Sequence, residues 1–353
     1  MAHLASASER AGVGGSTVAV GPGWLSGPAF DRHFIVTAAA IAILSGMLVA
    51  AHPGLFVPVL LLDLWLLGYH HVVSTYTQLC FDRENFARRR WLIFGLFPAV
   101  FAAVAAIGVT AGIWLLATIY LYWQWFHYTR QSYGIAQAYR RAAGGIADNE
   151  QLSRIVFYLV PLWGILHRAH QAPEFFLGLP VAHPPVPGWM VNTVAVLALA
   201  GLGWWIISRA MLWRDGRLPV GHTLYTISHF AVFYTGYVAI SDINAGWIAL
   251  NIWHNAQYIA FVWLQNNRRF GGSGARPDGS LFLAWLSQRK NLWAYLGFCL
   301  AISTAVYAGL QMSLADLAGG AALLIIASQT INFHHYIVDA LIWRRPRQAR
   351  AAS

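Results

Sequence analysis

The chain has 353 residues, of which 58% are hydrophobic and only 10% are charged. Soluble domains average about 25% charged residues, so a soluble fold would have too few charges for its surface. The net charge of +10 does not indicate nucleic-acid binding, because the basic residues fall in short loops and form no run alternating with aromatic residues. Two cysteines without CxxC spacing, Cys80 and Cys299, indicate neither a disulfide framework nor a thiolate metal site.

Ten apolar stretches of about the length that crosses a bilayer, roughly 20 residues, follow one another along the chain. They are expected at residues 33–51, 55–79, 91–110, 112–136, 153–169, 189–210, 219–240, 245–267, 291–309 and 316–343. Residues 1–30 predict a flexible N-terminal tail, 31–343 a transmembrane helical domain and 344–353 a basic C-terminal tail. We therefore expect an all-α, polytopic transmembrane helical bundle of about ten spans.

The distribution of arginine and lysine predicts an orientation. These residues cluster between segments two and three, four and five, six and seven, and eight and nine, and again after segment ten. The intervening loops are almost free of them. Because cytoplasmic loops carry the excess of positive residues, both the N- and C-termini are predicted to be cytoplasmic, in a multi-pass protein of a bacterial inner (plasma) membrane.

Eight of the 14 histidines lie well inside the predicted spans. Ionisable residues in spans are costly and usually face the bundle interior or a wet cavity. A single buried histidine is more often structural and hydrogen-bonded to a neighbouring helix, but eight on five helices favour a shared polar site. At 1.5 Å of rise per residue most of them fall within one slab about 10–15 Å thick; His222, close to the end of its segment, lies nearest the edge.

An all-nitrogen donor set suits iron, copper or zinc better than magnesium or calcium. Two histidines that are adjacent in the sequence point about 100° apart on a helix. One histidine of each adjacent pair is therefore expected to bind the metal. The other is expected to support a ligand or to pack against neighbouring helices. The candidate metal ligands are His70, His71, His127, His229, His254, His334 and His335.

Polar residues near the histidines are candidates for orienting them. Asp339 follows His335 by one turn and shares its helix face, where a carboxylate would fix the tautomer of the imidazole; an ordinary helix-face hydrogen bond is the alternative. Asp63 lies two turns before His70 on the same side of the segment, as a support, a proton path or a simple hydrogen-bonding group. The candidates are Asp63, Gln131, Gln257, Tyr258 and Asp339.

Four short motifs that contain histidine, which we call histidine words, follow one another along the chain. They are Gly68-Tyr69-His70-His71, Phe126-His127-Tyr128, His254 with Phe261-Val262-Trp263, and His334-His335-Tyr336-Ile337-Val338-Asp339. In this order they resemble the words of the Brp/Blh-type membrane β-carotene-cleaving oxygenases, over about half the chain. The first word departs by having Val72 and Ser74 where the family has Gly and Asp. The resemblance implies a non-haem iron held by histidines and cleavage of a polyene with O₂.

Three functions fit these features. The preferred one is a membrane-embedded, histidine-ligated non-haem iron oxygenase, a metal-dependent oxidoreductase whose partners are the lipid bilayer, O₂ and a lipophilic small molecule such as a polyene or acyl chain. The second is a transporter for a metal or small molecule with a histidine-lined path, although the chain shows no inverted repeat. The third is a haem-binding membrane protein with histidine axial ligands. Copper and zinc are the alternatives to iron.

Overall fold

The computed structural model describes residues 22–80, 83–270 and 281–343. Residues 1–21 of the predicted N-terminal tail, and the whole predicted C-terminal tail, lie outside the described residues. Residues 22–27 lie against the bundle, where the Gly221 N–H donates to the Pro22 carbonyl at 3.0 Å and Leu25 is buried.

Long apolar segments become helices here because a helix satisfies every interior backbone group within the segment. The first part of the chain forms α1 (Pro28–Arg32), η1 (His33–Thr37), α2 (Ala38–Ala51), η2 (Pro53–Leu55), α3 (Phe56–Asp63), η3 (Leu64–Gly68), α4 (Tyr69–Cys80), α5 (Arg83–Arg89), η4 (Leu92–Leu96), α6 (Phe97–Thr110), α7 (Ile113–Ala142) and α8 (Glu150–Gln171). The rest forms β1 (Phe175–Phe176), β2 (Leu179–Pro180), α9 (Gly188–Arg214), α10 (Val220–Tyr234), η5 (Thr235–Ala239), α11 (Ile243–Phe270), α12 (Leu281–Leu286), η6 (Arg289–Asn291), α13 (Leu292–Leu314) and α14 (Gly320–Ile342). Within the described residues the fold is all-α apart from one hairpin of two two-residue strands.

Six helices in the described ranges are long and apolar enough to cross a membrane, rather than the ten expected. They are Pro28–Ala51, Pro53–Cys80, Phe86–Thr110, Gly188–Arg214, Arg289–Leu314 and Gly320–Ile342. The other long helices, α7, α8, α10 and α11, coincide with apolar segments of the sequence but carry more polar side chains, many of them buried. Their lower apolar content therefore comes from polar groups that face the protein interior.

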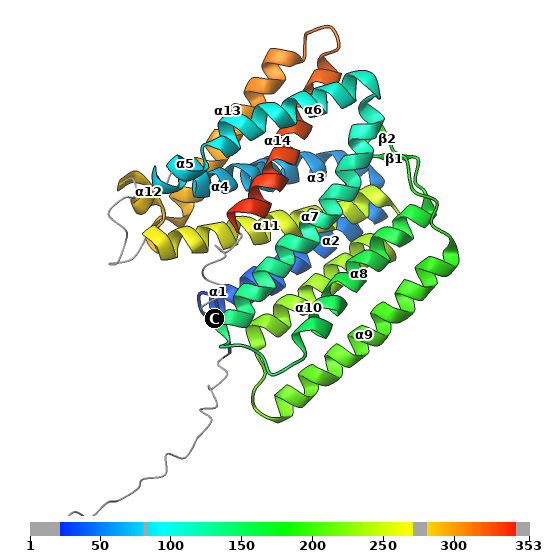
Figure 1. Ribbon diagram of the computed structural model, residues 1–353, viewed down its shortest axis with the longest axis vertical. Helices are drawn as coiled ribbons and strands as arrows, with labels where there is room; N and C mark the ends of the chain where they lie inside the picture. Colours follow the sequence, from blue (N-terminus) through cyan, green and yellow to red (C-terminus); the bar gives the residue numbers. More distant parts are fainter. Residues whose placement is uncertain (1–21, 81–82, 271–280, 344–353) are drawn as a thin grey trace, which may run out of the picture.

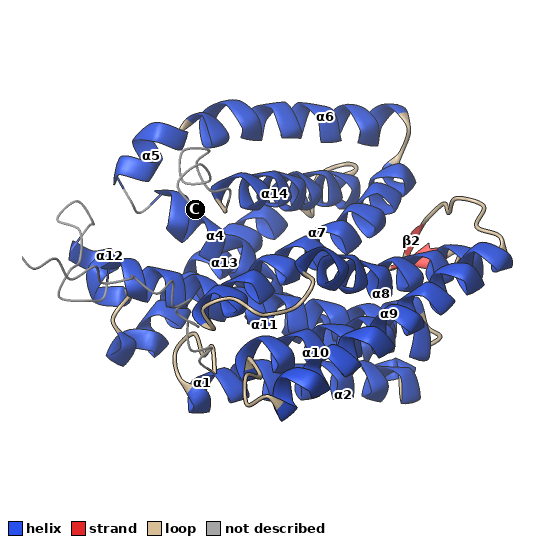
Figure 2. Ribbon diagram, turned by 60° about the horizontal axis from the view of Figure 1, so that its bottom comes forward, coloured by secondary structure: helices blue, strands red, loops and turns tan. Residues whose placement is uncertain are grey.

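Helix α11 runs through the middle of the bundle (Figures 1 and 2). It lies against α2, α3, α4, α7 and α10, and most of its residues are buried. Helix α9 covers α8 on one side, and α6 covers α14 on the other. A central helix touched from all sides can present side chains to several neighbours at once, and α11 supplies one histidine and two asparagines to the site described below.

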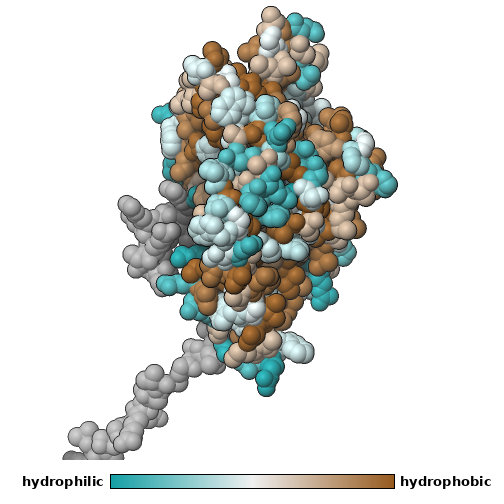
Figure 3. Space-filling model, turned by 90° about the vertical axis from the view of Figure 1, so that its right-hand side faces the viewer, coloured by the Kyte–Doolittle hydropathy of each residue, from teal (hydrophilic) through white to brown (hydrophobic). Residues whose placement is uncertain are grey.

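The two ends of the bundle differ. The connections from α2 to α3, α6 to α7 and α8 to α9, the last with the hairpin, lie at one end, while α5, α12 and the C-terminal end of α14 lie at the other (Figure 1). The second end carries the arginine-bearing connections of the sequence. Seen from its hairpin side, the molecule shows broad hydrophobic areas around a smaller polar patch (Figure 3).

Large apolar side chains are exposed on the outside of the bundle. Along α9 these are Trp189, Val196, Leu197, Leu199, Ile206, Ile207, Met211 and Trp213. Soluble monomers rarely expose contiguous apolar surface on this scale. The surface therefore agrees with a helical membrane protein.

One irregularity bears directly on the site. Between α3 and α4 the helix widens into a π-helical turn, η3, just before the first histidine pair. A π turn accommodates one extra residue, so the face that follows it is rotated by about 100° relative to a regular helix. In a regular helix Asp63 and His70 would share a face; with the extra residue Asp63 and His71 do.

Candidate metal centre

Four buried imidazoles, from α4, α7, α11 and α14, meet inside the bundle. They belong to His71, His127, His254 and His335, and we call them the histidine cluster. His71, His127 and His254 each offer one ring nitrogen, and these atoms lie within 4.8 Å of one another. The Nε2 atoms of His71 and His335 are 2.7 Å apart. The cluster thus brings together one histidine from each of the four words found in the sequence.

The nitrogen atoms of the cluster fit a metal ion. Buried polar atoms are normally paired, yet Nε2 of His127, Nε2 of His254 and Nδ1 of His71 have no hydrogen-bond partner. Metal–nitrogen bonds of about 2.0–2.1 Å place two nitrogens on one ion roughly 3–4 Å apart. The Nε2 atoms of His71 and His335 lie 2.7 Å apart, and one nitrogen each of His71, His127 and His254 lie within 4.8 Å of one another, so small ring movements would bring one nitrogen of each ring to a shared ion.

A chain of hydroxyl groups orients His335. Thr75 donates to the Tyr258 hydroxyl at 2.9 Å, so its oxygen is left to accept the Nδ1–H of His335 at 3.0 Å. A neutral imidazole with its proton on Nδ1 keeps a lone pair on Nε2, the atom that faces His71. Tyr258 in turn donates to Asp339 at 2.5 Å. Asp339 therefore reaches His335 through two hydroxyls and not directly.

His254 and His127 are held by stacking. The Tyr128 ring lies 3.8 Å from the His254 ring, centroid to centroid, and Tyr336 lies 4.2 Å from His127. The Gln131 amide is 3.3 Å from Nδ1 of His254, and a half-turn of this amide lets its oxygen accept the Nδ1–H. Gln131, one of the polar candidates from the sequence, thus supports His254.

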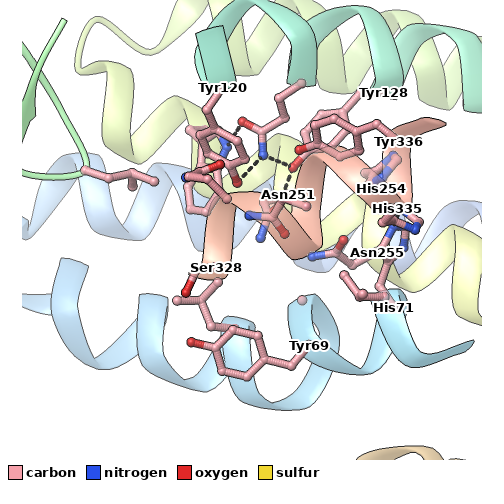
Figure 4. A pocket seen from close by; sticks show the side chains of 18 of the residues that line it. Tyr69, His71, Tyr120, Tyr128, Asn251, His254, Asn255, Ser328, His335 and Tyr336 are labelled. Atoms are coloured by element: carbon pink, nitrogen blue, oxygen red, sulfur yellow. Dashed lines mark hydrogen bonds between the residues drawn. The ribbon is translucent and has the colours of Figure 1, made fainter. Parts of the chain in front are cut away.

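A second polar network fixes Tyr128 from the hairpin side of the cluster (Figure 4). Tyr128 donates to Asn251, whose amide donates to Asp63 at 2.6 Å. Gln124 donates to Tyr128 at 2.5 Å and accepts from Trp247 at 2.8 Å. Asp63 therefore acts on the cluster through Asn251 and the Tyr128 ring.

Three predicted ligands lie outside the cluster. Both ring nitrogens of His334 are taken, by the Tyr76 hydroxyl and the Leu92 carbonyl, each at 2.6 Å. Both nitrogens of His229 are also taken, by Ser132 and Phe157. Among the described residues no ring contact joins His70 to another histidine. In each adjacent pair one histidine is in the cluster and the other is not.

Other residues were placed differently or were not expected. Gln257 donates to the Phe34 carbonyl at 2.7 Å and makes no hydrogen bond to the cluster histidines. Thr75, Gln124 and Asn251 have central roles that the sequence interpretation missed. A usable signal was present for Asn251, an amide one turn before a histidine inside an apolar segment.

A cavity of about 300 Å³ opens beside the cluster. His71, His254 and His335 line it at one end, and it extends past the side chains shown in Figure 4 toward Trp247 and the hairpin residue Leu177. Aromatic rings form much of its wall. The lining tyrosines are Tyr69, Tyr120, Tyr128, Tyr307 and Tyr336.

Comparison of the chain with protein-family models, with characterised proteins and with solved structures finds no match. The structure itself shows a buried histidine group that could hold a metal ion. It also shows that this group is built into a bundle of apolar helices.

Proposed function

We propose that this protein is a membrane-embedded non-haem iron oxygenase that acts on a lipid-soluble substrate. The observation that carries the proposal is the convergence of four buried imidazoles, three of which have an unpaired nitrogen, beside a cavity. A metal at the end of a pocket is accessible to a substrate and shielded from bulk water. Iron, bound there, would supply the activation of O₂ for oxidation of a carbon atom of the substrate.

The residues of the chain have three tasks in this proposal. His71, His127, His254 and His335 hold the ion. Thr75 fixes the Nδ1 proton of His335, which directs the lone pair of Nε2 into the site. The aromatic wall of the cavity positions an apolar part of the substrate and excludes water.

The donor set suits iron, copper and zinc, because imidazole binds all three, and the preference for iron comes from the resemblance to the Brp/Blh-type oxygenases. A haem fits less well. The cluster rings lie 4.6 to 5.1 Å apart for the pairs His71–His335, His71–His254, His127–His254 and His127–His335. Rings in such mutual contact leave no slot for the plane of a porphyrin between them.

The proposal gains support from the resemblance to the Brp/Blh-type oxygenases. Each of the four histidine words on which that resemblance rests contributes one ring to the cluster. The ligands suggested by the resemblance and those suggested by proximity are therefore compatible. Membership of that family, and a polyene substrate, stay proposals.

We further propose that the four polar long helices also cross the membrane, which gives ten spans with both termini in the cytoplasm of a bacterium. The buried polar side chains of α7 and α11 support this, since they face the site and not lipid. Single cysteines placed in the 143–149 and 172–187 connections should label from opposite sides of the membrane. Labelling of both from one side would contradict the topology.

The function is tested on the full chain purified in detergent. We expect about one equivalent of iron per chain by elemental analysis. Membranes that contain the protein, given ¹⁸O₂, should form a lipid-soluble product that carries ¹⁸O, and His127→Ala should abolish it. Folded protein that binds no added Fe(II) would refute the metal centre. Metal uptake into proteoliposomes without any oxidised product would instead indicate a transporter.

A further inference from the structure

The cavity wall formed by α14 carries polar side chains without protein partners. Ser328, Gln329 and Asn332 line the cavity, and within the described part of the chain none of them is hydrogen-bonded through its side chain. The buried Oε1 atom of Gln329 is among the unpaired acceptors. Buried amides without partners are rare in folded proteins, so these groups are available to a molecule in the cavity.

The wall that carries Gln124 and Asn251 is different, because both of these amides are already occupied. Gln124 and Asn251 use both ends of their amides for Tyr120, Tyr128, Trp247 and Asp63. That wall is fixed in shape and offers mainly ring faces. Recognition of a polar group therefore falls to α14 and to Asn255 of α11, which also lines the cavity and whose Nδ2 atom has no hydrogen-bond partner.

Spacing along α14 relates these groups to the cluster. Ser328, Asn332 and His335 are separated by four and three residues, so they follow one stripe of the helix. At 1.5 Å per residue the stripe extends about 4.5 Å from His335 to Asn332 and about 10 Å to Ser328. A molecule that binds this stripe can place a carbon atom near His335.

Charge and size narrow the class of molecule. Apart from histidine, no charged side chain of the described residues lines the cavity, so in the metal-free protein a carboxylate or phosphate would be buried without a counter-ion, at high cost. The volume of about 300 Å³ is at the lower end of the range for drug-sized ligands. A long polyene or a full acyl chain would extend beyond it.

We infer that the cavity binds a small uncharged amphiphile, whose hydroxyl, carbonyl or amide group is held by Gln329 and Asn332 while its hydrocarbon part lies against the aromatic wall. This inference rests on the proposed function only for the oxidation of the bound molecule, whose oxidised carbon would be the one held near His335. Binding itself needs only the cavity.

The test uses three photoreactive probes on the full chain in nanodiscs, after treatment with a chelator to remove any metal. Each probe is a ten-carbon chain with a diazirine at one end; the other end is a primary alcohol, a methyl group or a carboxylate. Labelling is located by peptide mass spectrometry and measured as a function of probe concentration. Asn332→Leu and Gln329→Leu test the stripe, and Asn192→Leu and Gln311→Leu are matched controls on exposed positions of α9 and α13.

We expect the alcohol to label cavity residues at about tenfold lower concentration than the other two probes, the effect of one or two hydrogen bonds. Each stripe variant should remove that preference, and each control should keep it. Equal labelling by the alcohol and the methyl probe, or tightest labelling by the carboxylate, would overturn the inference. The labelling is done on metal-free protein, so a result that overturns the amphiphile inference leaves the iron proposal intact. Conversely, if the alcohol probe is preferred but the protein never binds iron, only the iron proposal is refuted.

Discussion

Two buried histidines in this bundle, His335 and His229, have similar hydrogen-bond partners at Nδ1 but different partners at Nε2. At His335, Thr75 bridges the ring nitrogen Nδ1 and the Tyr258 hydroxyl. At His229, Ser132 bridges Nδ1 and the Tyr225 hydroxyl, at 3.0 and 3.2 Å. Both rings are buried. The difference is the other nitrogen: Nε2 of His335 faces an imidazole, whereas Nε2 of His229 lies 3.0 Å from the Phe157 carbonyl.

That difference identifies which histidine can bind a metal. A carbonyl oxygen only accepts, so Nε2 of His229 must be protonated and has no lone pair for an ion. The ring of His229 also stacks on Phe157 at 3.7 Å, which fixes it further. Burial and a hydroxyl partner are common to both sites, so neither property indicates a metal ligand by itself.

The largest expected effect separates adjacent residues of α14. His335→Ala should lower iron affinity by more than about 100-fold, beyond the 10–100-fold typical of residues that only support a ligand. His334→Ala should keep the iron, because both nitrogens of His334 bond to Tyr76 and Leu92. Elemental analysis and Fe(II) titration of the purified proteins measure this. Equal loss in both variants would remove the distinction between the two histidines.

His229→Ala should affect stability and not metal content. It removes the hydrogen bonds to Ser132 and Phe157 and the stacked ring, at a cost of about 2–4 kcal/mol. Unfolding by a denaturing detergent, followed by tryptophan fluorescence, gives the free-energy difference. The folded fraction of the variant should bind iron as the wild type does; a folded but iron-free variant would place His229 in the metal site.

A smaller effect is expected from the tyrosines that complete the two bridges. Tyr258→Phe removes the hydroxyl between Thr75 and Asp339, so the proton of His335 is held less firmly and iron affinity should fall about tenfold. Tyr225→Phe is the matched change at His229 and should leave iron affinity unchanged. Fe(II) titrations of both variants measure the two iron affinities. If Tyr258→Phe binds iron normally, the hydroxyl chain does not orient the ligand.

The smallest effect concerns acid stability on the side of the bundle that holds His229. Asp148, in the connection between α7 and α8, pairs with Arg209 and, at 2.8 Å, with Arg140. Burial opposes ionisation of Asp148, but Arg209, Ser153 and Arg140 outweigh it and hold the pKa of this carboxyl below its ordinary value of 3.8. Its contribution to stability is therefore complete above the unfolded pKa and is lost as the pH falls through the lower folded pKa.

Asp148→Asn should flatten the decrease in stability below about pH 4 and leave iron content at pH 7 unchanged. Unfolding midpoints of the wild type and the variant between pH 3 and pH 6 would show it. Parallel curves would mean that Asp148 does not contribute through its charge. A loss of iron would mean that this distant group is coupled to the cluster.

Much of this arrangement follows from the sequence, and the rest depends on tertiary contacts. Apolar segments predicted the long helices, and the cost of an imidazole in a span predicted that several histidines would share a site. The sequence could not predict that Asp339 acts through Tyr258, because their contact joins two helices. Nor could it distinguish His335 from His229, since the Phe157 carbonyl is not a property of either residue's neighbours in the chain.

The π-helical turn at Leu64–Gly68 has a consequence for how such a site can change during evolution. In genetic terms the turn is equivalent to the insertion of one codon. Deletion of one residue within it should restore a regular helix and keep His71 seven residues after Asp63, so His71 stays beside Asp63 and the cluster. Closing the turn at unchanged chain length would instead rotate α4 by roughly 100° relative to α3 and bring His70 to that position. The π turn therefore decides which histidine of the pair faces the cluster, without any change of side chain.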